Sequence, residues 1–153
     1  MGSLDPEIAA LQVLDYVGWG GVPPVNLSEI FPIYGIEWYF ADIPIPALTT
    51  YLDGAITIVV SRRLPRTAQR FRAAHEFGHI VLHQDYIRGW LPVTRAQERE
   101  ASRFAGAILC PITSFARDYQ LRETGVLPSV AVLGAYNVGP SVASYRFTLP
   151  AYQ

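Results

Sequence analysis

Internal disulfide bonds are excluded by the sequence, because Cys110 is the only cysteine among the 153 residues. A chain without disulfides is typical of a reducing compartment, so we expect a cytoplasmic protein. Apolar runs of the roughly 18 residues that a membrane-spanning helix needs are also missing. The first residues show no basic segment leading into an apolar one, so we expect neither a signal peptide nor a membrane partner.

Charge is scarce as well. Charged residues make up 16% of the chain, the net charge is −1, and 50% of the residues are hydrophobic. Without a basic excess, the composition predicts no direct nucleic-acid partner. The length and the apolar content instead predict one compact domain over residues 1–153, burying about two-thirds of the surface of the unfolded chain.

What the sequence does contain is the motif H-E-x-x-H, formed by His75, Glu76 and His79. Residues four apart lie on one face of a helix, so both imidazoles can reach one metal ion. Glu76 is rotated by about 100° from His75 and can approach a water molecule without binding the metal. This set suits zinc-dependent hydrolysis, in which the metal polarises a carbonyl and acidifies a water, and Glu76 takes the proton.

The residues around the motif predict a buried helix. Apolar side chains recur with a helical period over residues 70–84, and Thr67 is the predicted N-cap. Phe77, Ile80 and Val81 make the helix apolar nearly all round, so we expect it at the centre of the fold. The alternative, a pair of ordinary core histidines, fits a lone buried histidine well but explains the complete motif poorly.

Two helices are predicted before this one. Asp5 and Pro6 are typical of a helix start. The apolar face of that first helix is expected at Ile8, Leu11, Leu14 and Val17. Residues 26–31 predict a short second helix that ends at Pro32.

Strands are predicted between those helices and the motif. Their ranges are 36–41, 47–52 and 55–60, and Asp53-Gly54 is a strong hairpin signal between the last two. We expect a small antiparallel sheet. Its edge, bordering the metal site, could bind an extended peptide by strand addition.

A catalytic zinc needs a third protein ligand, which the next predicted helix can supply. Thr94 and Gln97 form a capping box at its start, and it stops at Pro111. Glu98 and Glu100 are the two candidates. Glu98 shares its face with small and apolar residues, namely Ala101, Ala105 and Ile108, which lets a second helix approach closely. Facing therefore favours Glu98 over Glu100, and at least one of the two is expected to be a surface charge.

These motifs resemble those of the ImmA/IrrE family of small zinc-dependent endopeptidases. The family motif R-F-x-x-A-H-E-x-G-H-x-x-x-H is matched at Arg70, Phe71, Ala74, His75, Glu76, Gly78, His79 and His83. The motif E-x-x-A-N-x-F-A-x-x-L-L-x-P is matched at Glu98, Ala101, Phe104, Ala105, Leu109 and Pro111. Ser102 stands where Asn is usual, and Gly106, Ile108 and Cys110 also depart from the pattern. The resemblance spans residues 47–111.

The resemblance implies a zincin-like minimal domain with one Zn²⁺ per chain, held by His75, His79 and Glu98, and Glu76 as the general base. It also implies that the protein partner is a helix-turn-helix transcriptional repressor, cut to regulate transcription in a stress response or in the induction of a mobile element. Manganese or another divalent ion stays open as the working metal.

Five further residues are candidates for supporting or substrate-binding roles. His83 lies about 12 Å beyond His75 along the helix, too far to share its metal easily. Trp90, in a predicted loop over residues 85–93, is a candidate for one cleft wall. Tyr136 and Tyr145 are candidates for stabilising an oxyanion, although aromatics in an apolar stretch more often belong to the core. Glu100 completes this group.

Residues 112–153 predict a helical extension to the core formed by residues 1–111. We expect a helix capped by Thr113 or Ser114 and ending near Gly125, followed by helices over residues 128–136 and 140–147. The fold class is thus α+β, a small antiparallel sheet with a helical bundle that carries the H-E-x-x-H helix.

The extension also suggests an alternative function. Residues 133–142 have the rhythm of a helix-turn-helix, which would make the chain a non-catalytic regulatory domain that binds DNA or protein. Its second helix offers only Ser141, Ser144 and Arg146 as polar groups, which is few for holding phosphates. A purely structural zinc is a further alternative, and it would normally need a fourth protein ligand.

Overall fold

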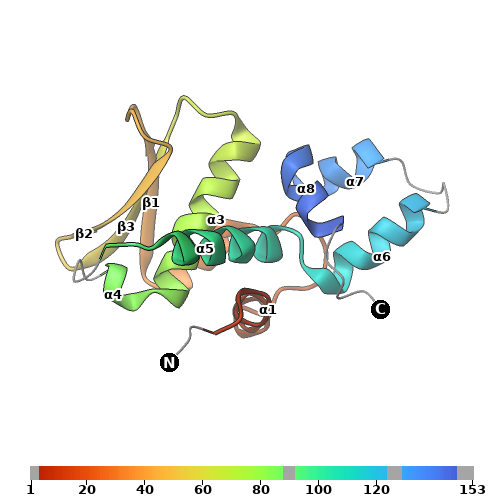
Figure 1. The fold of residues 1–153 in the computed structure, drawn as a ribbon, viewed down its shortest axis with the longest axis horizontal. Helices are drawn as coiled ribbons and strands as arrows, with labels where there is room; N and C mark the ends of the chain where they lie inside the picture. The colour runs from red at the N-terminus through yellow and green to blue at the C-terminus, as the bar shows by residue number, and fades with distance from the viewer. Residues whose placement is uncertain (1–3, 88–91, 124–128, 148–153) are drawn as a thin grey trace.

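The computed structural model describes residues 4–87, 92–123 and 129–147, and it confirms the α+β class (Figure 1). The elements in order are α1 (Pro6–Tyr16), α2 (Leu27–Ile33), β1 (Ile36–Ala41), β2 (Ala47–Leu52), β3 (Ala55–Ser61), α3 (Arg66–Leu82), α4 (Gln84–Ile87), α5 (Arg95–Leu109), α6 (Ile112–Glu123), α7 (Ser129–Tyr136) and α8 (Pro140–Phe147). None of these helices combines the length and the apolar character needed to cross a membrane.

The sheet is mixed, with the strand order β1-β3-β2. Strands β2 and β3 form the predicted antiparallel hairpin, whose turn places Asp53 and Gly54 at φ angles of 50° and 82°. Strand β1, however, runs parallel to β3, so the prediction of a wholly antiparallel sheet is wrong for this pair. After β1, the connection over residues 42–46 leads to β2, which lies two strand positions away. Strand β3 then occupies the position between them. Local periodicity predicts strands but not their order.

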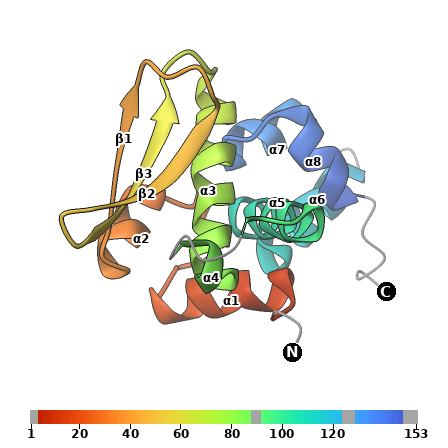
Figure 2. The same cartoon turned by 60° about the vertical axis from the view of Figure 1, so that its left-hand side comes forward.

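Helix α3 lies at the centre, with the sheet on one side and α5 and the C-terminal helices on the other (Figure 2). The inner face of the sheet contributes the fully buried Ile58 and Val60 to the core. Phe31 of α2 packs edge-on against both Trp38 and Phe77, with centroid distances of 5.2 Å. The central position that was predicted for the motif helix is therefore observed.

Helix α1 packs against α5 through a face that only partly matches the predicted one, because Leu14 is buried but Ile8 is not. The capping prediction is correct, because the Asp5 carboxylate accepts hydrogen bonds from the backbone N–H groups of Glu7 and Ile8. The buried side chains are Pro6, Ala9, Ala10, Val13 and Leu14, whereas Ile8 is 49% exposed. Small alanines allow close helix packing, so the contact with α5 selects this stripe rather than the one marked by the bulkier residues.

Several element boundaries also differ from the predictions. Helix α3 begins at Arg66, after Pro65, so Thr67 is inside the helix and is not its N-cap. Helix α2 continues through Pro32 to Ile33, and α6 begins at Ile112 without the predicted cap. The predicted loop over residues 85–93 starts with the short helix α4, and residues 88–91 lie outside the described part of the chain.

The C-terminal helices are fixed to the core by buried polar side chains. Arg146 of α8 is fully buried, donates to the carbonyl of Cys110 at 3.1 Å and pairs with the Glu7 carboxylate. Arg70 of α3 donates to the carbonyls of Val25, Tyr136 and Asn137. The N-terminal helix, the motif helix and the C-terminal extension are thereby connected.

Candidate metal centre

Three side chains from two helices converge on one point. His75 and His79 lie one turn apart on α3, and Glu98 lies in the first turn of α5. Their candidate ligand atoms all lie within 4.8 Å of one another. The Glu98 carboxylate is 2.7 Å from Nε2 of His79 and 3.4 Å from Nε2 of His75. As the facing argument predicted, Glu98 joins the two histidines and Glu100 does not.

A close helix crossing positions Glu98. A Cβ added at Gly78 would lie 3.1 Å from Cα and from the carbonyl oxygen of Ala101, and 3.1 Å from Phe104. A glycine in α3 facing an alanine in α5 therefore lets the two backbones approach closely. Without this approach, a carboxylate on α5 would not reach both imidazoles on α3.

The outer nitrogens of both imidazoles are occupied by hydrogen bonds. Nδ1 of His75 lies 3.1 Å from Oγ of Ser102, and Nδ1 of His79 lies 2.9 Å from Nδ1 of His83. When each Nδ1 carries the proton of that bond, each Nε2 directs its lone pair towards the cluster. Ser102, which departs from the family motif, thus takes a contact that orients His75.

His83 and Glu100 extend this arrangement. Nε2 of His83 is buried, has no hydrogen-bond partner among the described residues, and lies 3.6 Å from Oε1 of Glu100. Both residues were predicted to lie beside the ligands, and the structure brings them together there. His83 supports His79 rather than the cluster itself, as its position two turns after His75 suggested.

Burial keeps the histidines in the neutral form that a metal requires. Desolvation, with the nearby His79, lowers the pKa of His75 to about 4. The pKa of His79 is also lowered by desolvation, against the opposing effect of Glu98. Two neutral imidazoles and one carboxylate are a donor set that fits zinc and leaves a coordination position for water or substrate. Within the described residues the cluster has three members, which is the number typical of a catalytic rather than a structural site.

Glu76 is held against the sheet, next to the cluster. Glu76 is 7% exposed, and its carboxylate accepts a hydrogen bond of 2.5 Å from the hydroxyl of Thr49 in β2. The pKa of Glu76 is raised overall, because desolvation outweighs the lowering effects of the Thr49 hydrogen bond and the Arg72 charge. A buried carboxylate with a raised pKa is suited to accept a proton and give it up again. Sequence reasoning missed Thr49, and only the pairing of β2 with β3 reveals which face of β2 meets α3.

Among the remaining candidates, Tyr136 does not join the cluster. The Tyr136 hydroxyl is buried and hydrogen-bonded to Ser114 at 3.0 Å and to Asp118 at 2.5 Å, which makes it a core residue. Its hydroxyl is thereby committed to α6, so the structure does not support an oxyanion role for it. Tyr145 belongs to α8, but its side chain is not among those that the structure describes. Trp90 lies wholly outside the described residues.

Comparison with known proteins identifies the family. The family profile of IrrE N-terminal-like domains, peptidase family M78, matches residues 42–148. The search of curated proteins gives no match. A solved structure of a Mycobacterium tuberculosis transcriptional regulator is similar, with a TM-score of 0.65 and 21% sequence identity over 95% of this chain and 48% of that one. That likeness shows a shared fold, and this chain spans about half the length of that protein. Because the profile match covers most of the chain and includes all three clustered side chains, the protein belongs to the family of IrrE N-terminal-like peptidase domains.

Proposed function

We propose that the protein is a zinc-dependent endopeptidase that hydrolyses a peptide bond in a specific protein partner. The observation that carries this proposal is the position of Glu76, a buried carboxylate beside a cluster of two histidines and one glutamate. Family membership supports a function of the metallopeptidase type. Zinc is the proposed metal because two nitrogen donors and one oxygen donor suit it.

Each residue at the candidate metal centre has a separate proposed role. His75, His79 and Glu98 would hold the cation, and the chemistry it would supply there is that of a Lewis acid for the scissile carbonyl and for water. Glu76 accepts the proton from the attacking water and then delivers it to the leaving amine. Thr49 orients the Glu76 carboxylate through its hydrogen bond, and Ser102 and His83 orient the two imidazoles. Strand β2 is an edge strand, so an extended substrate can pair with it beside Glu76.

We further propose that the substrate is a transcriptional repressor of the helix-turn-helix class and that the reaction takes place in the cytoplasm. The family resemblance supports this substrate, and the similar solved structure is named a transcriptional regulator. Cleavage of a repressor would relieve repression, in keeping with a role in a stress response.

The test combines metal analysis with a proteolysis assay. The purified protein is expected to contain about one zinc per chain, and His75→Ala and Glu98→Ala are expected to lower that content. Glu76→Gln should keep the zinc and lose cleavage of a co-expressed helix-turn-helix repressor, measured by mass spectrometry of its fragments. Glu29→Gln, an exposed site on α2, is the matched control. Retained cleavage by Glu76→Gln would remove Glu76 from the mechanism, and a protein that binds no divalent metal would refute the proposal.

The DNA-binding alternative finds little support in the C-terminal helices. Helices α7 and α8 are joined by a turn in which Asn137 has a φ angle of 54°, consistent with the predicted helix-turn-helix rhythm. Arg146 is the only basic residue of these two helices, and it is fully buried against Glu7 and Cys110. It is therefore not available to hold a DNA phosphate.

A further inference from the structure

A large pocket opens beside the candidate metal centre. Its volume is about 770 Å³, and its walls come from the first turns of α3, from α5 and from the start of α8. Glu98 and Ser102 line this pocket, and the same two side chains contact His75. The pocket is therefore continuous with the point on which the three candidate ligands converge.

The interior of the pocket is mainly apolar. Its apolar lining comes from Pro46, Leu64, Ala68, Phe71 and Val142. Phe71 also lies near the metal centre, since its ring centroid is 6.4 Å from that of His75. A volume of this size falls in the range of pockets that enclose small ligands, so it can accept a large side chain together with the adjoining backbone.

Arginine side chains from two helices reach the same pocket. Arg72 of α3 and Arg99 and Arg103 of α5 all line it. Arg103 lies 3.6 Å from the Asp5 carboxylate, whereas the described residues offer no ion pair to Arg72 or Arg99. Among the described residues of the lining, Glu98 is the only acidic one, and we assign it to the metal. The chain contains no lysine, so every cation here is a guanidinium, which suits bidentate binding of a carboxylate.

We propose that this pocket selects the substrate: it receives a large apolar side chain next to the scissile bond, while Arg72 and Arg99 bind an acidic side chain close to it. The occupant is thus an extended segment of the protein substrate in which an apolar residue stands within two positions of Asp or Glu. This inference rests on the proposed peptidase function. The charge of the arginines and the continuity with the metal centre select this occupant over an uncharged one.

The test begins with a selection of peptides. Zinc-loaded protein carrying Glu76→Gln is used to capture binders from a random peptide library, because it should hold substrates without cutting them. The expected binders share a large aliphatic or aromatic residue with Asp or Glu within two positions. A selection that enriches no such pair would overturn the proposal. Competition by duplex DNA against the selected peptides for the same surface would also overturn it.

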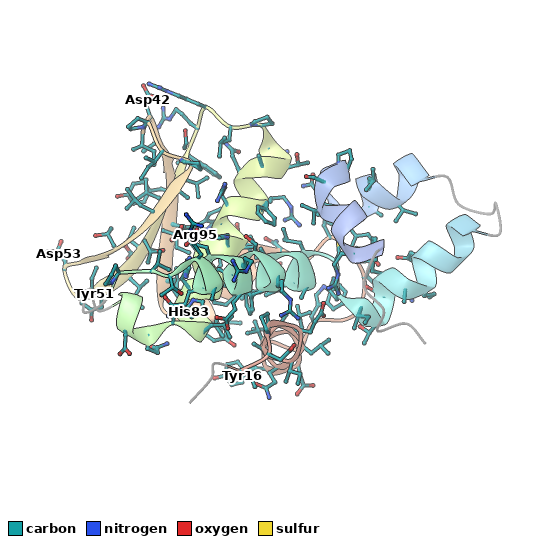
Figure 3. All side chains as sticks on the ribbon, in the orientation of Figure 1. Tyr16, Asp42, Tyr51, Asp53, His83 and Arg95 are labelled. Carbon is teal, nitrogen blue, oxygen red and sulfur yellow. The ribbon has the colours of Figure 1, made fainter. Side chains whose placement is uncertain are left out.

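Matched variants then locate the contacts. In the same background, Arg99→Ala should weaken binding of a selected peptide roughly threefold to tenfold, since one partly exposed carboxylate contact is lost. The same substitution should not affect a peptide in which Gln replaces the acid. Arg95→Ala is the control, because Arg95 lies at the start of the same helix (Figure 3), is exposed, and is not among the residues that line the pocket. Ala68→Phe, which fills the pocket, should weaken both peptides.

The outcomes separate this inference from the proposed function. Peptide binding that is unchanged by both Arg99→Ala and Ala68→Phe would refute the role of the pocket in substrate selection, even if the wild-type protein cuts its substrate. Selected peptides that respond to both variants but are never cut by the zinc-loaded wild-type protein would instead refute the peptidase function and leave the pocket as a binding site.

Discussion

Buried polar side chains serve opposite purposes in two regions of this molecule. Around α3 and α5, the imidazoles of His75 and His79 turn their Nε2 atoms towards a single point that they share with Glu98. In the C-terminal region, the buried polar groups of Arg146 and Tyr136 are bonded to partners inside the chain. Polar groups that converge on one point indicate a ligand site, whereas polar groups bonded to partners within the chain indicate structural support.

The two regions should therefore respond differently to substitution. Changes in the paired region are expected to lower the free energy of unfolding, because they leave a buried polar partner unsatisfied. Changes around the cluster are expected to alter metal binding and activity with smaller effects on folding.

The largest effect is expected at Arg146. Arg146→Met would leave the Glu7 carboxylate and the Cys110 carbonyl without their partner and should lower the free energy of unfolding by about 3–5 kcal/mol. Chemical denaturation of the metal-free protein measures this. Arg117→Met is the control, because the Arg117 side chain is 61% exposed and its one ion pair with a described residue is to its neighbour Asp118, so its loss should cost under about 0.5 kcal/mol. Equal costs for the two variants would contradict the structural role of Arg146.

The next largest effect on stability is expected at the crossing of α3 and α5. Gly78→Ala places a Cβ 3.1 Å from the Ala101 backbone and should cost about 1–3 kcal/mol of stability, because a backbone cannot yield as a flexible side chain can. It should also weaken metal binding, since α5 carries Glu98. At Gly134 in α7 an added Cβ meets no described residue within 4 Å, so Gly134→Ala should be neutral or slightly stabilising. Denaturation and zinc titration of both variants compare the two sites, and unchanged zinc affinity in Gly78→Ala would show that α5 does not depend on this contact.

Local signals in the sequence account for much of this architecture. The caps at Asp5 and Thr94 and the hairpin at Asp53-Gly54 are formed as predicted, because caps and turns depend on residues a few positions apart. The H-E-x-x-H spacing and the apolar face beside Glu98 also placed the three clustered side chains correctly.

Contacts between distant segments were not predictable in the same way. The partners Arg146 and Glu7 are 139 positions apart, and Thr49 reaches Glu76 across 27. Neither pair follows a periodicity, because the pairing depends on how whole elements pack. The parallel direction of β1 and the buried stripe of α1 were mispredicted for the same reason.

A smaller effect is expected from His83, which tests whether the contacts beyond the ligands matter. His83→Phe removes the acceptor for Nδ1 of His79 and should weaken zinc binding about 10- to 100-fold, the usual cost of losing such an orienting partner. The aromatic ring should preserve most of the packing at this buried position. Ser102→Ala offers the parallel change at His75. Competition with a chelating dye measures both affinities, and wild-type affinity in both variants would show that the imidazoles need no orienting partner.

A pH dependence of the metal-free protein is also expected. His75 has a folded-state pKa of about 4 against an ordinary value of 6.5, so between these values the unfolded chain binds a proton that the folded chain does not. The free energy of unfolding should therefore fall as the pH is lowered through this window, by at most about 1.4 kcal/mol per pH unit from this residue. The raised pKa of Glu76 acts in the opposite direction, so the total slope mixes the two groups. Comparison with His75→Gln isolates the histidine, because the variant should lose stability less steeply between pH 6.5 and 4. Parallel curves for the two proteins would mean that burial does not hold His75 neutral, and the contrast between the converging and the paired polar groups would then lose its electrostatic basis.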